Sequence, residues 1–113
     1  MIKRGEIYLV RFDPARGSEQ AGTRPALVIQ NDIGNEFAST TIVAAMSTRA
    51  VALFDSRVSV RPRESGLREA STILLDQVLT VDMGRLGRRI GRLSVPAMQE
   101  VDRAIQHSLG LLI

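Results

Sequence analysis

The chain has 113 residues, which suffices for one hydrophobic core but not for two, so we expect a single domain spanning residues 1–113. It has no cysteine, which excludes disulfides and thiolate metal sites, and no apolar run that fits a signal peptide or a membrane span, so a cytoplasmic location is expected. Fifteen basic and twelve acidic residues give a formal net charge of +3, and every basic residue except Lys3 is arginine. The planar guanidinium group suits phosphate and indicates a nucleic-acid partner, although a genome rich in G and C would produce the same bias.

The first half of the chain is typical of three β-strands. Residues 5–12 alternate between apolar and polar side chains, which predicts the first strand. Residues 25–30 are nearly all apolar, as in a central strand, and a proline is tolerated at its first position. Residues 40–46 are β-branched and apolar, which predicts a third strand. The segment between them, residues 31–35, has the composition of a turn.

The second half contains further short strands and then changes its period. Strands are predicted at residues 57–61, 71–78, 79–82 and 88–93. Many short strands close together predict a small barrel. Ser94 is suited to cap a following helix that has Pro96 in its first turn. The helix has an apolar stripe, which we expect to pack on the barrel, with a dimer surface as the alternative; it consists of Met98, Val101, Ile105 and Leu109.

Few residues offer catalytic chemistry. The only histidine, His107, falls on the polar or flanking side of the predicted helix, where a solvated role is usual. No group of His, Asp and Glu shows the spacing of metal ligands, and no glycine-rich phosphate loop opens a helix, so neither a metal nor a cofactor is expected. Arg24 stands directly before Pro25 at the start of the apolar central strand. Its rigid position suits either a structural ion pair or a fixed clamp for phosphate.

Three segments of the chain carry a resemblance to a known family. They are RGEIYLVRFDPARGSEQAGTRPALVIQND, TTIVAAMST and STILLDQVLTVD, which are distributed between residues 4 and 82. The chain resembles the MazF/PemK-type toxins, the endoribonuclease partners of type II toxin–antitoxin systems. The resemblance implies a mainly β fold, a small SH3-like (CcdB/PemK-like) barrel with a C-terminal α-helix. It also implies a homodimer that cleaves single-stranded RNA without metal or ribosome, prefers a short sequence, arrests growth, and is neutralised by an acidic MazE-like antitoxin.

The resemblance assigns catalytic roles residue by residue. The arginine before proline in this family is Arg24, and the acidic residue of the GSEQ loop is Glu19. The hydroxyl residue that ends the third strand is Ser47, where many relatives have threonine, and the adjacent Thr48 is an alternative bearer of that role. The resemblance thus implies Arg24, Ser47 and Glu19 as the catalytic residues.

Further positions are implied for RNA binding. Ser18 and Gln20 flank the acidic residue of the GSEQ loop, and Thr48 follows the hydroxyl position. Gln77 is suited to read a base edge, although a polar residue in a strand more often satisfies backbone groups. The family often has arginine at the position of Leu79, and its absence here leaves the RNA sequence preference open.

A mechanism without histidine or metal remains available for RNA. The 2′-hydroxyl attacks the adjacent phosphorus, which gives a 2′,3′-cyclic phosphate and a 5′-hydroxyl end. Arginine is effectively always protonated, so Arg24 is expected to stabilise the developing charge, with Ser47 positioning the phosphate and Glu19 as the base. The alternative is a CcdB-like gyrase poison, which binds without cutting. That class relies on a tryptophan near the C-terminus, and this chain has none.

Overall fold

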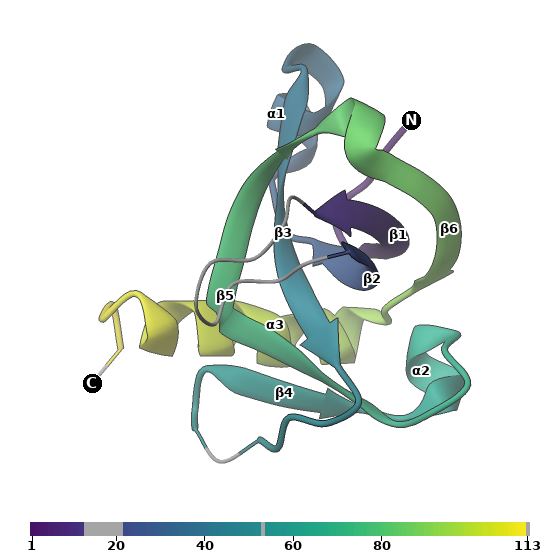
Figure 1. The fold of residues 1–113 in the computed structure, drawn as a ribbon. Coiled ribbons are helices and arrows are strands. Elements are labelled where there is room, and N and C mark those ends of the chain that lie inside the picture. The colour runs from purple at the N-terminus through teal and green to yellow at the C-terminus, as the bar shows by residue number, and fades with distance from the viewer. Residues whose placement is uncertain (13–21, 53, 113) are drawn as a thin grey trace.

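A computed structural model of the protein describes residues 1–12, 22–52 and 54–112. Six strands form one antiparallel sheet with the order β4-β5-β3-β2-β1-β6, which curls strongly upon itself (Figure 1). The predicted mainly β barrel is thereby confirmed. The strands are β1 (Glu6–Phe12), β2 (Gly22–Val28), β3 (Thr40–Ser47), β4 (Arg57–Val60), β5 (Ser71–Asp82) and β6 (Leu86–Arg92).

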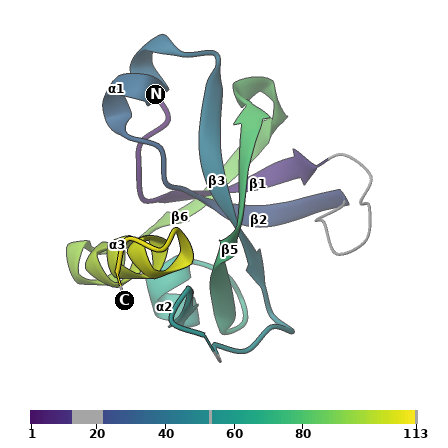
Figure 2. The same cartoon turned by 90° about the vertical axis from the view of Figure 1, so that its left-hand side faces the viewer.

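The helices are placed around this curled sheet. Helix α3 lies against β4 and β5, while the short α1 and α2 lie towards opposite ends of the molecule (Figure 2). Within the described residues, no helix is both long and apolar enough to cross a membrane. The helical elements are α1 (Asp32–Phe37), α2 (Pro62–Ser65), the 3-10 turn η1 (Met83–Arg85) and α3 (Val95–Ser108).

The second half of the central strand β2, from Ala26 to Val28, is buried on both faces, which explains why these residues are all apolar. Successive side chains of a strand point to opposite faces. Leu27 accordingly joins the core between the sheet and α3, whereas Ala26 and Val28 join a second core that also contains Val10 and Val43. Curling the sheet therefore gives a chain of this length two apolar clusters, one on each face of β2.

The C-terminal helix begins where the sequence predicts. The hydroxyl of Ser94 accepts a hydrogen bond from the backbone N–H of Ala97 at 3.3 Å, and the helix has a proline in its first turn. The face in contact with the barrel is centred on Ala97, Val101 and Ala104, each at most 4% exposed. The helix packs on the barrel as expected, but the predicted apolar stripe is only partly correct. The small residues Ala97 and Ala104 form part of the contact and permit close packing, whereas Leu109 at the end of the stripe is 66% exposed.

Two predictions of local structure were wrong. Residues 31–35 do not form a simple turn, because the Asn31 side chain accepts the N–H of Gly34 at 2.8 Å and caps the helix α1. The two strands expected at 71–78 and 79–82 are one strand, β5. Ala44 pairs with Val78 and Ala45 with Leu74, so three extra residues interrupt the ladder there. Such irregularities bend a strand, and this one allows β5 to follow the curl of the sheet.

Candidate active site

A cleft of about 700 Å³ opens at the end of the sheet where β2 begins and β3 ends. Its lining comes from five parts of the chain: β1, β2, β3 with the following loop, the segment from α2 to β5, and β6. Four of its lining residues are arginines and one is a glutamate, so the cleft carries an excess of positive charge. It is suited to an anionic ligand.

The register of the antiparallel strands brings distant residues to this cleft. Pro25 pairs with Leu9 across β2 and β1, and Ser47 pairs with Thr72 across β3 and β5. Because neighbouring antiparallel strands run in opposite directions, the start of β2, the end of β3 and the start of β5 lie at one end of the sheet. Arg24 and Ser47, which lie 23 positions apart by their numbers (47 − 24), therefore line the same cleft.

Arg24 combines a fixed backbone with an exposed side chain. Its backbone lies in the β1–β2 ladder opposite Val10, and the next residue, Pro25, has a restricted backbone of its own. The Val10 side chain is fully buried, which anchors this part of the ladder, whereas Arg24 is exposed and lines the cleft. The guanidinium group is thus presented to solvent from a rigid strand.

Ser47 ends β3 and shapes the loop that follows. Its Oγ accepts hydrogen bonds from the backbone N–H groups of Arg49 at 3.1 Å and Ala50 at 3.3 Å. A hydroxyl has two acceptor positions and one donor proton. With both acceptor positions engaged, the Ser47 hydroxyl is left to act as a donor. Thr48 also lines the cleft and is more exposed than Ser47.

A second wall of the cleft is built by close contact between α2 and β6. Gly66 ends α2 with φ +81°, and a Cβ atom there would lie 2.7 Å from the carbonyl oxygen of Ile90. A Cβ atom on Gly91 would collide with the carbonyl oxygen of Ser65. Only glycine permits this approach at either position.

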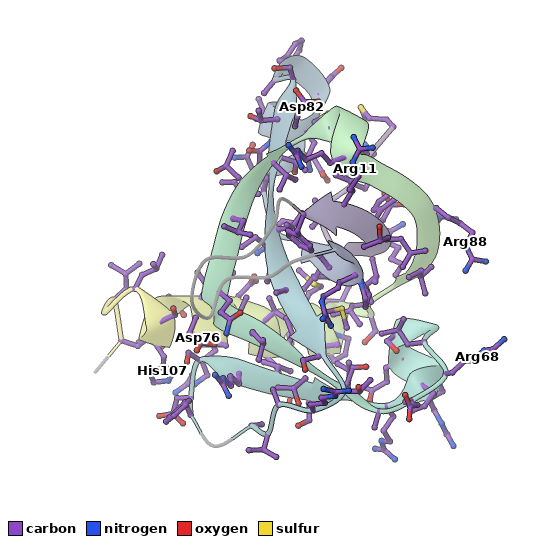
Figure 3. The ribbon with its side chains drawn as sticks, viewed as in Figure 1. Arg11, Arg68, Asp76, Asp82, Arg88 and His107 are labelled. Atoms are coloured by element: carbon purple, nitrogen blue, oxygen red, sulfur yellow. The ribbon has the colours of Figure 1, made fainter. Side chains whose placement is uncertain are left out.

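The residues after Gly66 carry charge into the cleft. Arg68 and Glu69 follow the close contact along the chain, and Arg88 comes from β6. Arg68 and Arg88 project from the same side of the molecule (Figure 3). All three side chains are exposed and line the cleft. The contact between α2 and β6 therefore sets a second charged wall beside Arg24 and Ser47.

The other implied residues do not all meet in this cleft. Ser18, Glu19 and Gln20 lie outside the residues that the structure describes. Gln77 is half-buried within the interruption of β5 and does not line the cleft. The predicted RNA contact of Gln77 therefore has no support from the position of this cleft.

Asp76, next to Gln77, has a structural partner. The Arg57 guanidinium donates hydrogen bonds of 3.2 Å and 3.0 Å to its two carboxylate oxygens, and these bonds lower the pKa of Asp76. His107 lines a different hollow of about 450 Å³ beside Arg57. Asp76 and His107 lie on the side of the molecule away from Arg68 and Arg88 (Figure 3). Within the described residues, no group of three or more His, Asp or Glu side chains is arranged to hold a metal ion.

Sequence reasoning missed Arg68, Glu69 and Arg88 as residues of the cleft. Arg68 and Glu69 lie in a hydrophilic segment, and Arg88 in a strand with several arginines, so nothing in the local pattern distinguishes them from solvated surface charges. Their only signal is the pair of glycines, Gly66 and Gly91, and its meaning depends on a contact between distant segments.

The protein is thus a small barrel, and its cationic cleft lies at the start of the central strand β2. Residues 3–109 match the family described as "PemK-like, MazF-like toxin of type II toxin-antitoxin system", and the chain belongs to this family. It is 43% identical to "Endoribonuclease EndoA" of Bacillus subtilis over 113 residues, which covers 99% of this chain and 97% of that protein. The matches contradict the CcdB-like alternative.

Solved structures share the fold at lower identity. An "Endoribonuclease in complex with its cognate antitoxin from Mycobacterial species" is 19% identical with a TM-score of 0.84, over 100% of this chain and 99% of that one. "Mycobacterium tuberculosis toxin MazF-mt6" is 22% identical with a TM-score of 0.81, over 96% and 99%. MazF from Deinococcus radiodurans is 23% identical with a TM-score of 0.79, over 96% of each chain. These likenesses confirm the barrel with its C-terminal helix.

Proposed function

We propose that this protein is a cytoplasmic endoribonuclease toxin that cleaves single-stranded RNA at a preferred short sequence, without metal or ribosome. The observation that carries the proposal is the shared cleft of Arg24 and Ser47 in a member of this toxin family. Its relative of 43% identity is named an endoribonuclease. Cleavage of messenger RNA would halt translation and growth.

The proposed reaction uses a nucleophile that belongs to the RNA. The 2′-oxygen attacks the adjacent phosphorus, a bond forms between them, and the bond from phosphorus to the 5′-oxygen breaks. The 2′-hydroxyl proton goes to a base, for which we propose Glu19, and the 5′-oxygen takes up a proton from the solvent as it leaves. The products are a 2′,3′-cyclic phosphate and a 5′-hydroxyl. Water is not the nucleophile in this step, and no oxidant is needed.

Arg24 and Ser47 act on the phosphate in this proposal. The guanidinium of Arg24 places a permanent positive charge and two parallel N–H donors beside the phosphoryl oxygens, where negative charge grows in the transition state. Ser47 donates its remaining proton to one of these oxygens, because its two acceptor positions already bind backbone N–H groups. The same bonds hold the β3–β4 loop, so the hydroxyl is oriented before the RNA arrives.

Partners follow from the same cleft. We propose that the protein works as a homodimer and that an acidic MazE-like antitoxin neutralises it by covering the cationic cleft. One solved relative is described as a complex with its cognate antitoxin, which supports an antitoxin as a partner of this protein. An acidic segment that folds on binding is able to cover a large basic surface.

The test begins with one long RNA of defined sequence. Purified protein should cut it at few sites in the presence of excess chelator, and end mapping should find a cyclic phosphate on one fragment and a 5′-hydroxyl on the other. A short RNA with deoxyribose just 5′ of the mapped bond should then resist cleavage and still bind, since one hydroxyl contact contributes about 1 kcal/mol. Cutting of this deoxy-substituted RNA, or loss of activity with chelator and recovery with magnesium, refutes the mechanism.

A further inference from the structure

Among the residues that the structure describes, some arginines are paired with carboxylates and others are not. Four arginines are held by ion pairs with carboxylates, namely Arg4 with Asp102, Arg57 with Asp76, Arg61 with Glu64 and Arg89 with Glu6. Arg68 and Arg88 differ: within the described part of the chain, no hydrogen bond or ion pair engages either side chain. Both line the cleft and are exposed.

Strand order places Arg88 near Arg24 but not beside it. Leu9 in β1 pairs with Pro25 on one side, and its carbonyl oxygen lies close to Gly87 on the other. Arg88 is therefore level with the start of β2 and two strand spacings away, about 10 Å at the usual spacing of strands. This separation suits a phosphate that neighbours the one held by Arg24.

Arg68 reaches the same side of the cleft from another element. The docking of α2 on β6 through Gly66 and Gly91 sets the position of the segment that carries it. Arg68 and Arg88 project from the same side of the molecule (Figure 3). Two cations from separate elements, both without a partner among the described residues, thus stand at one wall of a cleft.

We propose that Arg68 and Arg88 form a phosphate subsite that binds the RNA backbone next to the scissile phosphate. The inference rests on the proposed function for the identity of the ligand. RNA is favoured over an acidic peptide because the subsite lies in the same cleft as Arg24 and Ser47. An RNA backbone has a charge at every nucleotide and therefore needs cations at successive positions along the cleft. Arg68 and Arg88 contact no base and so serve affinity at every sequence.

The first experiment compares matched variants that remove one charge each. The ligand is a short RNA whose deoxyribose blocks cleavage, and its affinity is measured as salt increases. Arg68→Gln and Arg88→Gln should each weaken binding by about three- to fivefold, the range of an exposed ion pair. The controls are Arg63→Gln on α2 and Arg92→Gln on β6, which are exposed and lie outside the cleft. These controls should bind as the wild type does.

The salt dependence measures how many phosphates the protein neutralises. For single strands, the slope of log affinity against log salt changes by about 0.7 for each phosphate that a variant no longer neutralises. Because the two arginines bind one phosphate, the double variant Arg68→Gln/Arg88→Gln should reduce the slope by about 0.7, with a larger effect on KM than on kcat. A slope equal to that of the control variants overturns the proposal.

The second experiment identifies the phosphate of the RNA that the subsite binds. Methylphosphonate linkages remove the charge of one phosphate at a time, at the scissile position and at each of its neighbours. A neighbouring neutral linkage should weaken binding by the wild type about three- to fivefold and have no further effect on the double variant. Coupling at the scissile linkage alone, or at none, contradicts a subsite for the neighbouring phosphate.

These results separate the subsite from the proposed activity. If the double variant shows the predicted reduction in slope but the wild type never cuts RNA, the activity is wrong and the subsite stands. If the wild type cuts RNA while the cleft variants and the controls have equal affinity, the activity stands and the subsite is wrong. A double variant that instead loses affinity for an oligoglutamate peptide and keeps its affinity for RNA assigns Arg68 and Arg88 to an acidic protein partner. That result also overturns the proposal.

Discussion

Replacing Arg24 by alanine tests the central catalytic assignment. The guanidinium is exposed in the cleft and is proposed to meet charge that develops only in the transition state. Removing one such donor from an enzyme costs about 10²–10³ in kcat, and Arg24 supplies a full charge as well as its fork of donors. We therefore expect a loss of at least about 10³, which corresponds to about 4 kcal/mol of transition-state stabilisation.

The same substitution should leave the fold intact. Arg24 is exposed, and contacts of exposed charged side chains contribute about 1 kcal/mol or less to the free energy of unfolding. The backbone of this strand is held by its ladder with β1 and by buried neighbours, which the substitution does not alter. The melting temperature should accordingly change by only a few degrees.

The assay is single-turnover cleavage of a short RNA that contains one mapped site, with protein in excess so that weak binding is overcome. Arg92→Ala serves as the matched control, because it removes an exposed arginine outside the cleft. Arg24→Lys should recover only part of the rate, since lysine keeps the charge but not the planar fork. Cleavage by Arg24→Ala within about threefold of the wild type would show that this residue does not stabilise the transition state.

Three further predictions concern the hydroxyls, the base and acid stability. Ser47→Ala should lower the cleavage rate by about 10², the effect of removing one donor, while Thr48→Val cuts normally; the reverse result transfers the hydroxyl role to Thr48. Glu19→Gln should lower the cleavage rate and flatten its dependence on pH. If instead Glu69→Gln lowers the rate and Glu19→Gln does not, Glu69, which lines the cleft, is the base. Burial raises the pKa of Glu6, but hydrogen bonds from Arg89, the Lys3 backbone and Tyr8 outweigh it, so its folded pKa lies below the ordinary 4.5. The ionised Glu6 therefore stabilises the folded protein above about pH 4.5, and this stabilisation is lost as the pH falls through the folded pKa. The melting temperature of the wild type should drop in that range, and that of Glu6→Gln should drop less.

Local chemistry in the sequence determined the elements that depend on neighbouring residues. Ser94 and the following proline marked the start of α3, because capping involves groups within one turn of helix. The apolar run after Arg24 identified a strand buried on both faces, and the observed β2 is central in the sheet. The family resemblance, carried by long segments of sequence, supplied Arg24 and Ser47.

Only the tertiary structure decided which other residues line the cleft with Arg24 and Ser47. Arg68, Glu69 and Arg88 have no local pattern that separates them from solvated charges, and they line the cleft because α2 packs on β6. That contact requires glycine at positions 66 and 91, yet neither glycine indicates its partner, since the two segments are joined by the whole of β5 and the turn after it. The donor role of Ser47 likewise follows from the path of the β3–β4 loop, which brings two backbone N–H groups to its oxygen. The sequence determined which residues carry the chemistry of one wall. Long-range packing determined the charges of the second wall, because their positions depend on contacts between residues far apart in the chain.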